Sequence, residues 1–382
     1  MDFDFTEEQR LLKESLDRLI ADRYGFEQRQ SYAQNPEGWS RPLWRQLAEL
    51  GLLGLPFAER LGGSDGGAVE TMIVMEGFGH ALALEPYLAT VVLGGGFLRH
   101  GGSEAQQAAL LPQIAAGELT LAFAATERHS RYDLADIATT ARRDGSGWIL
   151  DGEKGVVLHG DSADRLIVTA RIGGGQRERD GIALFLVDAA AEGVARRGYP
   201  TQDGLRAAEV ALSRVRVEGD AVLGEPGAGL PLVERVVDEA IAALCAEAVG
   251  AMSALHELTL DYLKTRQQFG RTIASFQVLQ HRSVDMLIAL EQARSMALYA
   301  TMMVDSPDAA ERHAAVAAAK VQIGRTGRFI GQQAIQLHGG IGMTMEYKAG
   351  HYFKRLTMID TMFGDADYHL WALARDGRPV AA

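Results

Sequence analysis

Residues 266–270, which read Arg-Gln-Gln-Phe-Gly, decide the fold together with the Gln-Leu-His-Gly-Gly-Ile-Gly stretch at 336–342. Residues three apart in a helix share one face, so Arg266 and Phe269 can contact one ligand together. A guanidinium can donate two hydrogen bonds to phosphate oxygens, and an aromatic ring can lie on an adenine. Adjacent glycines such as Gly339 and Gly340 let backbone approach a bound molecule closely. The two stretches therefore suit a ligand that carries phosphate groups and a flat ring.

The composition excludes several classes of protein. The chain has 382 residues, 47% of them hydrophobic and 23% charged, which suits two or three globular domains. The net charge of −12 argues against a nucleic-acid binder and against binding to an anionic membrane surface. No apolar run reaches the length of a membrane span, and the acidic start lacks the basic segment of a signal peptide. The single cysteine, Cys245, excludes an internal disulfide, so we expect a cytoplasmic protein.

The pattern along the chain predicts three domains. Residues 1–118 read as helical and open with a capping-box pattern from Thr6 to Gln9. Short apolar runs between glycine and aspartate clusters at 119–225 predict an antiparallel barrel or sandwich. Residues 226–382 return to long helices. No Rossmann fingerprint or P-loop is present, and no two histidines have helical metal-site spacing, so we expect no metal.

In this order, the stretches at 266–270, 276–281 and 336–342 resemble the C-terminal helical domain of the acyl-CoA dehydrogenase flavoproteins. The resemblance covers nearly the whole chain. It implies a helical N-terminal domain, a central antiparallel β domain and a C-terminal four-helix bundle that forms a dimer of dimers. It also implies FAD, with the adenine and pyrophosphate half of a neighbouring subunit's cofactor covered by this domain. The residues that carry this role over are Arg266, Phe269, Phe276, Gln336, Gly339 and Gly340.

The segment after the first predicted strand is similar to the Thr-Glu signature of the family, in which threonine and backbone contact the flavin ring. Thr126 follows a strand that contains Phe123 and Ala125, and Asp133 keeps the spacing of the family's aspartate. Between them, Arg-His-Ser-Arg-Tyr at 128–132 replaces the usual Pro-Gly-Ala-Gly-Ser. The resemblance therefore implies that Phe123, Ala125 and Thr126 lie on the flavin side.

The next predicted strand departs from the family at two positions. Val156 stands where the family has a tryptophan that shields the flavin. Leu158 stands where the family has a threonine or serine that hydrogen-bonds near the reactive nitrogen. Leucine cannot donate a hydrogen bond. The flavin-ring half of the site is thus degraded in this chain, whereas the adenine half is intact.

The sequence also departs from the family at the position of the catalytic base. Acyl-CoA dehydrogenation needs a carboxylate that removes the α-proton while hydride leaves the β-carbon for the flavin. The family's C-terminal glutamate falls by register on Gly364, with Asp365 one residue later. The family's second solution falls on Ala240, with Glu239 beside it. Asp365 is therefore the candidate base, and a helix-cap, structural or interface role is its alternative.

The resemblance implies FAD-dependent α,β-dehydrogenation of an acyl-CoA thioester, alone or as one subunit of a heteromeric enzyme. The Gly-Asp-Ala-Asp stretch at 364–367 is most similar to the small subunit of pimeloyl-CoA-type or steroid-side-chain-type dehydrogenases. The implied partners are an acyl-CoA, electron-transfer flavoprotein and a homo- or hetero-tetramer with a paralogous subunit. Two alternatives stay open: a catalytically silent partner that completes a flavin site on a paralogous chain, and a flavin oxidase or monooxygenase on the same fold.

Overall fold

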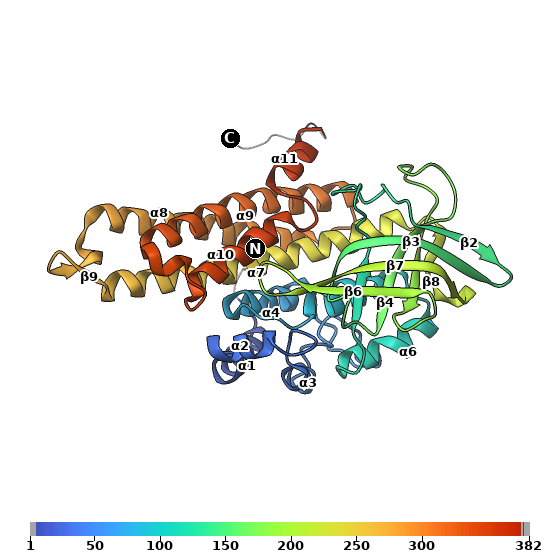
Figure 1. Ribbon diagram of the computed structural model, residues 1–382, viewed down its shortest axis with the longest axis horizontal. Helices are drawn as coiled ribbons and strands as arrows, with labels where there is room; N and C mark the ends of the chain where they lie inside the picture. The colour runs from blue at the N-terminus through green and yellow to red at the C-terminus, as the bar shows by residue number, and fades with distance from the viewer. Residues whose placement is uncertain (1–4, 376, 378–382) are drawn as a thin grey trace. The chain divides into compact units, whose positions relative to one another are not determined.

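The computed structural model describes residues 5–375 and residue 377. The chain forms two compact units: one holds residues 31–67 and 84–240, and the other holds the described parts of 1–30, 68–83 and 241–382. Figure 1 follows the chain from blue N-terminal helices through green strands to the orange and red C-terminal helices. Within the described ranges, no helix is both long and apolar enough to cross a bilayer.

The N-terminal part is helical, as predicted. Thr6 accepts a hydrogen bond from the backbone of Gln9, and the Gln9 side chain accepts one from the backbone of Thr6, which is the expected capping box. Its helices are α1 (Glu7–Arg23), α2 (Phe26–Ala33), α3 (Arg41–Glu49), η1 (Glu59–Leu61), α4 (Ala68–Ala81), η2 (Leu88–Gly94), α5 (Gly95–Gly101) and α6 (Glu104–Ala115).

The central part is one eight-stranded sheet with the order β6-β7-β3-β2-β4-β5-β8, and β1 pairs with β4. Its strands are β1 (Leu121–Ala124), β2 (Thr140–Asp144), β3 (Gly147–Leu158), β4 (Arg165–Arg171), β5 (Ile182–Asp188), β6 (Val194–Pro200), β7 (Arg206–Val217) and β8 (Val222–Gly227), with the turn η3 (Gly219–Ala221) before β8. Most pairs are antiparallel, as predicted, but β1 and β2 both pair parallel with β4. The core of the sheet includes Trp148 and Phe185, whose rings meet edge to face at 5.4 Å.

The C-terminal part consists of long helices, as predicted. They are α7 (Leu230–Thr265), α8 (Gln277–Met303), α9 (Ala309–His338), α10 (Lys348–Thr361) and α11 (Ala366–Arg375), with short elements β9 (Gln267–Gln268), β10 (Arg271–Thr272), η4 (Ile273–Ser275) and η5 (Gly339–Met343). Helix α9 packs against α8, α10 and α11.

Two glycines let α4 and α7 cross with their backbones in contact. A Cβ atom on Gly79 would lie 1.8 Å from the carbonyl oxygen of Glu247, and one on Gly250 would lie 1.9 Å from that of Glu76. Any larger residue at either position would therefore separate the two helices.

Candidate functional site

The first predicted cofactor stretch lies on a tight hairpin. Helix α7 ends at Thr265, and β9 and β10 pair antiparallel directly after Arg266. Phe269 and Gly270 form the turn, with φ of +56° and +73°. The expectation that Arg266 and Phe269 share a helix face is therefore wrong, because the helix ends at Thr265 and the chain between the two residues is an extended strand. A phenylalanine at positive φ is strained, and such strain clusters at functional sites.

The hairpin displays aromatic and cationic side chains to solvent. The Phe269 side chain is 90% exposed, and its ring meets that of Phe276 edge to face at 6.1 Å. The guanidinium carbon of Arg271 lies 4.2 Å from the centre of the Phe276 ring, a cation–π arrangement. The exposed Arg266 side chain has no hydrogen-bond or ion-pair partner within the described residues. This short segment thus carries an exposed aromatic ring and, at Arg266, a guanidinium without a partner among the described residues.

The second predicted stretch is anchored next to the end of α7. His338, the last residue of α9, donates from Nδ1 to the carbonyl oxygen of Ala334 at 2.8 Å. Its ring lies 4.7 Å from that of Tyr262, near the end of α7. His338 thus fixes backbone and contacts the end of the helix that leads into the first stretch.

The turn that follows His338 is open. Gly339 has φ of +64°. A Cβ atom on Gly339 or on Gly340 would meet no atom within 4 Å, and Gln336 is exposed one turn earlier. A bound molecule can therefore reach this backbone, which fits the adenine and pyrophosphate end of FAD.

The predicted flavin-ring residues lie where β1 ends. The ring of Phe123 is buried against that of Phe97, with centroids 4.6 Å apart, so its side chain belongs to the core. Ala125 is half-buried, and the side chain of Thr126 is exposed. The carbonyl oxygen of Thr126 accepts a hydrogen bond of 2.8 Å from the backbone of Gly155 in β3.

Strand β3 bulges at this contact. Its pairing with β7 shifts register between Lys154 and Val157, and Val156 has φ of +51°. A β-branched residue rarely adopts this conformation, and bulges often re-aim side chains beside sites. The bulge leaves Val156 51% exposed, and Leu158 is half-buried. Neither side chain can donate or accept a hydrogen bond.

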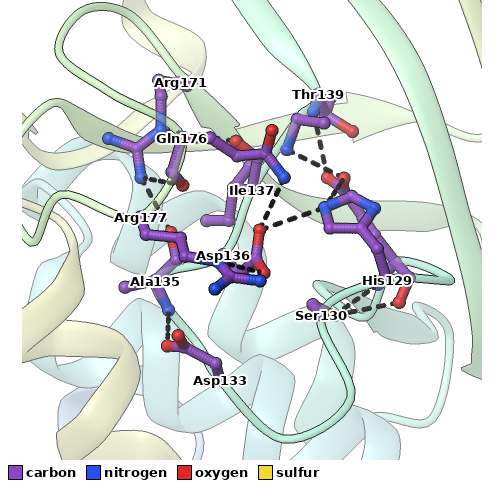
Figure 2. Close-up of polar contacts among 12 residues, drawn as sticks. His129, Ser130, Asp133, Ala135, Asp136, Ile137, Thr139, Arg171, Gln176 and Arg177 are labelled. Carbon is purple, nitrogen blue, oxygen red and sulfur yellow. Dashed lines mark hydrogen bonds and ion pairs between the residues drawn. The ribbon is translucent and has the colours of Figure 1, made fainter.

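The replaced segment at 128–132 belongs to a polar network that was not predicted. His129 Nε2 lies 3.2 Å from Asp136 Oδ1, and Asp136 also accepts from Gln176 at 2.7 Å and from Arg177 at 2.9 Å. Figure 2 shows these contacts converging on the buried Asp136 carboxylate. Burial alone would raise the pKa of Asp136, but the bonds from Gln176 and Arg177 lower it overall.

Arg171, the last residue of β4, binds the backbone of the segments around Asp136 and Arg177. Its guanidinium donates to six backbone carbonyl oxygens, those of Ala135, Ile137, Gly173, Gln176, Glu178 and Asp180. An arginine at the end of a largely apolar strand is the sequence signal for such a hub, although nothing in the sequence identifies its acceptors.

The turn at the expected base position has no space for a side chain. Gly364 has φ of +107°, and a Cβ atom there would lie 2.5 Å from Tyr368 Cδ1 and 2.7 Å from His369 Nε2. Lys320 Nζ fixes the turn by donating to carbonyl oxygens at 2.8–2.9 Å, those of Ile359, Asp360, Met362 and Gly364. Burial lowers the pKa of Lys320 to about 8. The register position of the base is thus a packed structural turn.

The carboxylates next to the two register positions of the base, Asp365 beside Gly364 and Glu239 beside Ala240, each have a partner of their own. Asp365 caps α11, since its Oδ1 accepts from the backbone of Tyr368 at 2.8 Å. Glu239 accepts from Arg99 and from His100, both at 2.7 Å. Burial alone would raise the pKa of Glu239, but the bond from His100 and the charge of Arg99 lower it overall. Glu239 is therefore held as a paired anion.

Comparison with known protein families gives matches along nearly the whole chain. The N-terminal, middle and C-terminal domains of acyl-CoA dehydrogenase match residues 6–118, 122–218 and 227–377. The chain belongs to the acyl-CoA dehydrogenase family. It is therefore assigned to an oxidoreductase family with the three-domain fold, and FAD is the family's cofactor.

Three relatives illustrate the range of the family. A probable acyl-CoA dehydrogenase of Bacillus subtilis, YngJ, is 29% identical over 98% of this chain and 99% of its own length. The ChsE4–ChsE5 complex of Mycobacterium tuberculosis has a chain with 26% identity, a TM-score of 0.89 and full coverage of both chains. An FAD complex of PigA has 27% identity and a TM-score of 0.90, covering 98% of this chain and 99% of the other.

Proposed function

We propose that this chain takes part in the FAD-dependent α,β-dehydrogenation of an acyl-CoA thioester. The observation that carries the proposal is the ring contact of Tyr262 with His338, which links the end of the helix before the exposed hairpin to the open glycine turn, in a chain of this family. Arg266 is suited to the pyrophosphate, and Phe269 and Phe276 to the adenine. At Gly339 and Gly340, next to Gln336, the cofactor can approach the backbone closely. The bound flavin supplies the hydride acceptor.

Removal of the α-proton requires a carboxylate, and Asp365 is the candidate within this chain. One of its oxygens already caps α11, and the Gly364 position beside it accepts no side chain. We infer the remaining assembly from the family: an electron-transfer flavoprotein as acceptor, and a cytoplasmic tetramer that includes a second copy or a paralogous chain.

A second candidate function is a partner subunit that lends Arg266, Phe269 and Gln336 to a flavin on a paralogous chain. Two observations favour it: Gly364 is packed against Tyr368 and His369, and Leu158 offers no hydroxyl. One solved relative is itself a complex of two proteins, ChsE4 and ChsE5. This reading keeps the adenine half of the site and places the base and the flavin ring on the other chain.

Flavin content tests both candidates. We expect Arg266→Ala to lose FAD, because charge-assisted hydrogen bonds are worth about 1.5–3 kcal/mol. That corresponds to a rise in Kd of about tenfold to over a hundredfold. Arg10→Ala on α1 is the control, being an exposed arginine in the same unit. Unchanged flavin content in Arg266→Ala, with FAD bound by the wild type, would refute the assignment of the hairpin.

The two candidates differ in what the chain does alone. A yellow protein, bleached anaerobically by an acyl-CoA without any partner, supports the self-sufficient dehydrogenase. A colourless chain that holds flavin only when co-expressed with a paralogue supports the partner subunit. Flavin that is reduced by substrate and then rapidly reoxidised by oxygen supports the oxidase alternative and contradicts both.

A further inference from the structure

A buried ion pair lies directly behind the flavin-side threonine. The Lys154 side chain, in β3, is 0% exposed and its Nζ lies 2.7 Å from Glu127 Oε1. The same nitrogen donates to Thr169 Oγ1 at 3.0 Å and to the carbonyl oxygen of Ala125 at 3.3 Å. All three protons of the ammonium are therefore used. A buried charge is costly unless it is paired and hydrogen-bonded, and both conditions hold here.

Glu127 is held as firmly as its partner. Its carboxylate accepts from the backbone of Ala138 at 2.9 Å and of Thr139 at 3.0 Å. Its own N–H donates to Ser130 Oγ at 3.0 Å. Burial alone would raise the pKa of Glu127, but the charge of Lys154 lowers it overall. Burial lowers the pKa of Lys154 only to about 8, so the pair is charged at neutral pH.

In the sequence, Thr126 lies between two of the three residues that Lys154 binds, Ala125 and Glu127. The carbonyl oxygen of Ala125 precedes it, the Glu127 side chain follows it, and its own carbonyl oxygen accepts from Gly155. Its backbone is thus restrained on both sides. Within the described residues, the N–H and the hydroxyl of Thr126 have no hydrogen-bond partner, and the residue is exposed. Two free donors on a restrained backbone form a ready contact for a ligand with adjacent acceptors.

We propose that Lys154 and Glu127 are positioning residues that fix the two donors of Thr126 for the carbonyl and ring-nitrogen acceptors of a flavin. This inference rests on the proposed function. Neither residue needs to touch the flavin, since both are buried. Lys154 also immediately precedes the bulge, so the pair fixes the backbone of Gly155 and Val156 on the same side of the strand. The pair acts through geometry, because a donor that is turned away from its acceptor is largely lost.

The test is a double-mutant cycle on the FAD-loaded protein, alone or assembled with its partner chain. Lys154→Met removes the pair, and Thr126→Val removes the hydroxyl. We expect each to weaken FAD binding about threefold to tenfold and to shift the visible flavin bands and the midpoint potential. Because part of the effect of Lys154 passes through the hydroxyl that Thr126→Val removes, the double variant should lose less affinity than the sum of the two single variants. Glu127→Gln, which keeps the size of the side chain, carries the test if Lys154→Met does not fold.

The outcomes separate this inference from the proposed function. Two results would show that the pair is purely structural and would overturn the inference alone. One is additive effects in the cycle. The other is a lower thermal midpoint in a variant that keeps the flavin spectrum, potential and affinity of wild type. A wild-type protein that binds no FAD in any assembly overturns the proposed function and the inference with it.

Discussion

Gly364→Glu restores, by register, the glutamate that serves as base in the family, yet we expect it to destabilise the protein and to give no gain in dehydrogenase activity over wild type. The Cβ atom alone would lie 2.5 Å from Tyr368 Cδ1 and 2.7 Å from His369 Nε2. The backbone at φ of +107° suits glycine and strains any other residue.

The cost follows from these two effects. A strained backbone costs about 1–3 kcal/mol, and overpacking costs about the same again, so we expect a loss of about 2–6 kcal/mol. With an unfolding entropy of about 2.1 cal/mol/K per residue, the thermal midpoint should fall by about 3–7 °C.

The assay is thermal unfolding, followed by anaerobic bleaching of bound flavin with acyl-CoA. Gly173→Ala is the control, because a Cβ atom there meets nothing within 4 Å and its backbone is not left-handed. A midpoint within about 1 °C of wild type, or substrate bleaching that appears only in Gly364→Glu, would refute the reasoning. Either result would mean that the turn held by Lys320 rearranges to present a side chain.

Three further predictions concern the site and its surroundings. If Asp365 is the base, Asp365→Asn should keep fold and flavin, since asparagine caps as well as aspartate, and cut turnover about 10²–10⁴-fold; turnover near wild type in it and in Glu239→Gln would place the base on another chain. Leu158→Thr should tighten flavin binding by about 0.5–1.5 kcal/mol, the worth of one neutral hydrogen bond, and a fall in flavin occupancy would contradict this. His369 has its pKa lowered to about 3 by burial and by the charge of Lys320, so the unfolded chain binds its proton more tightly. The free energy of unfolding should therefore fall as the pH falls from 6.5 towards 3, by roughly 2 kcal/mol between pH 7 and pH 5. In urea unfolding, His369→Gln should lose correspondingly less stability over the same pH range.

The sequence determined the order of the domains and the family because these depend on local patterns. The capping box at Thr6, the long helical periodicity after Leu230 and the glycines at 339–340 each express a local preference that the fold retains. Residue type alone likewise shows that Leu158 lacks the hydroxyl, and Gly364 the carboxylate, of the corresponding family positions. The prediction that the adenine half of the site is the more complete one therefore rests on residue types alone.

Only the tertiary structure decided how these residues are presented. Phe269-Gly270 lacks the Asn-Gly or Asp-Gly signal of a tight hairpin, so helical spacing suggested a shared face where the chain in fact turns back. The partners of Lys154, and the atoms that fill the space beside Gly364, come from segments that only folding brings together. A residue's type sets which bonds it can make, whereas burial and distance decide which of them form, and both are properties of the packed chain.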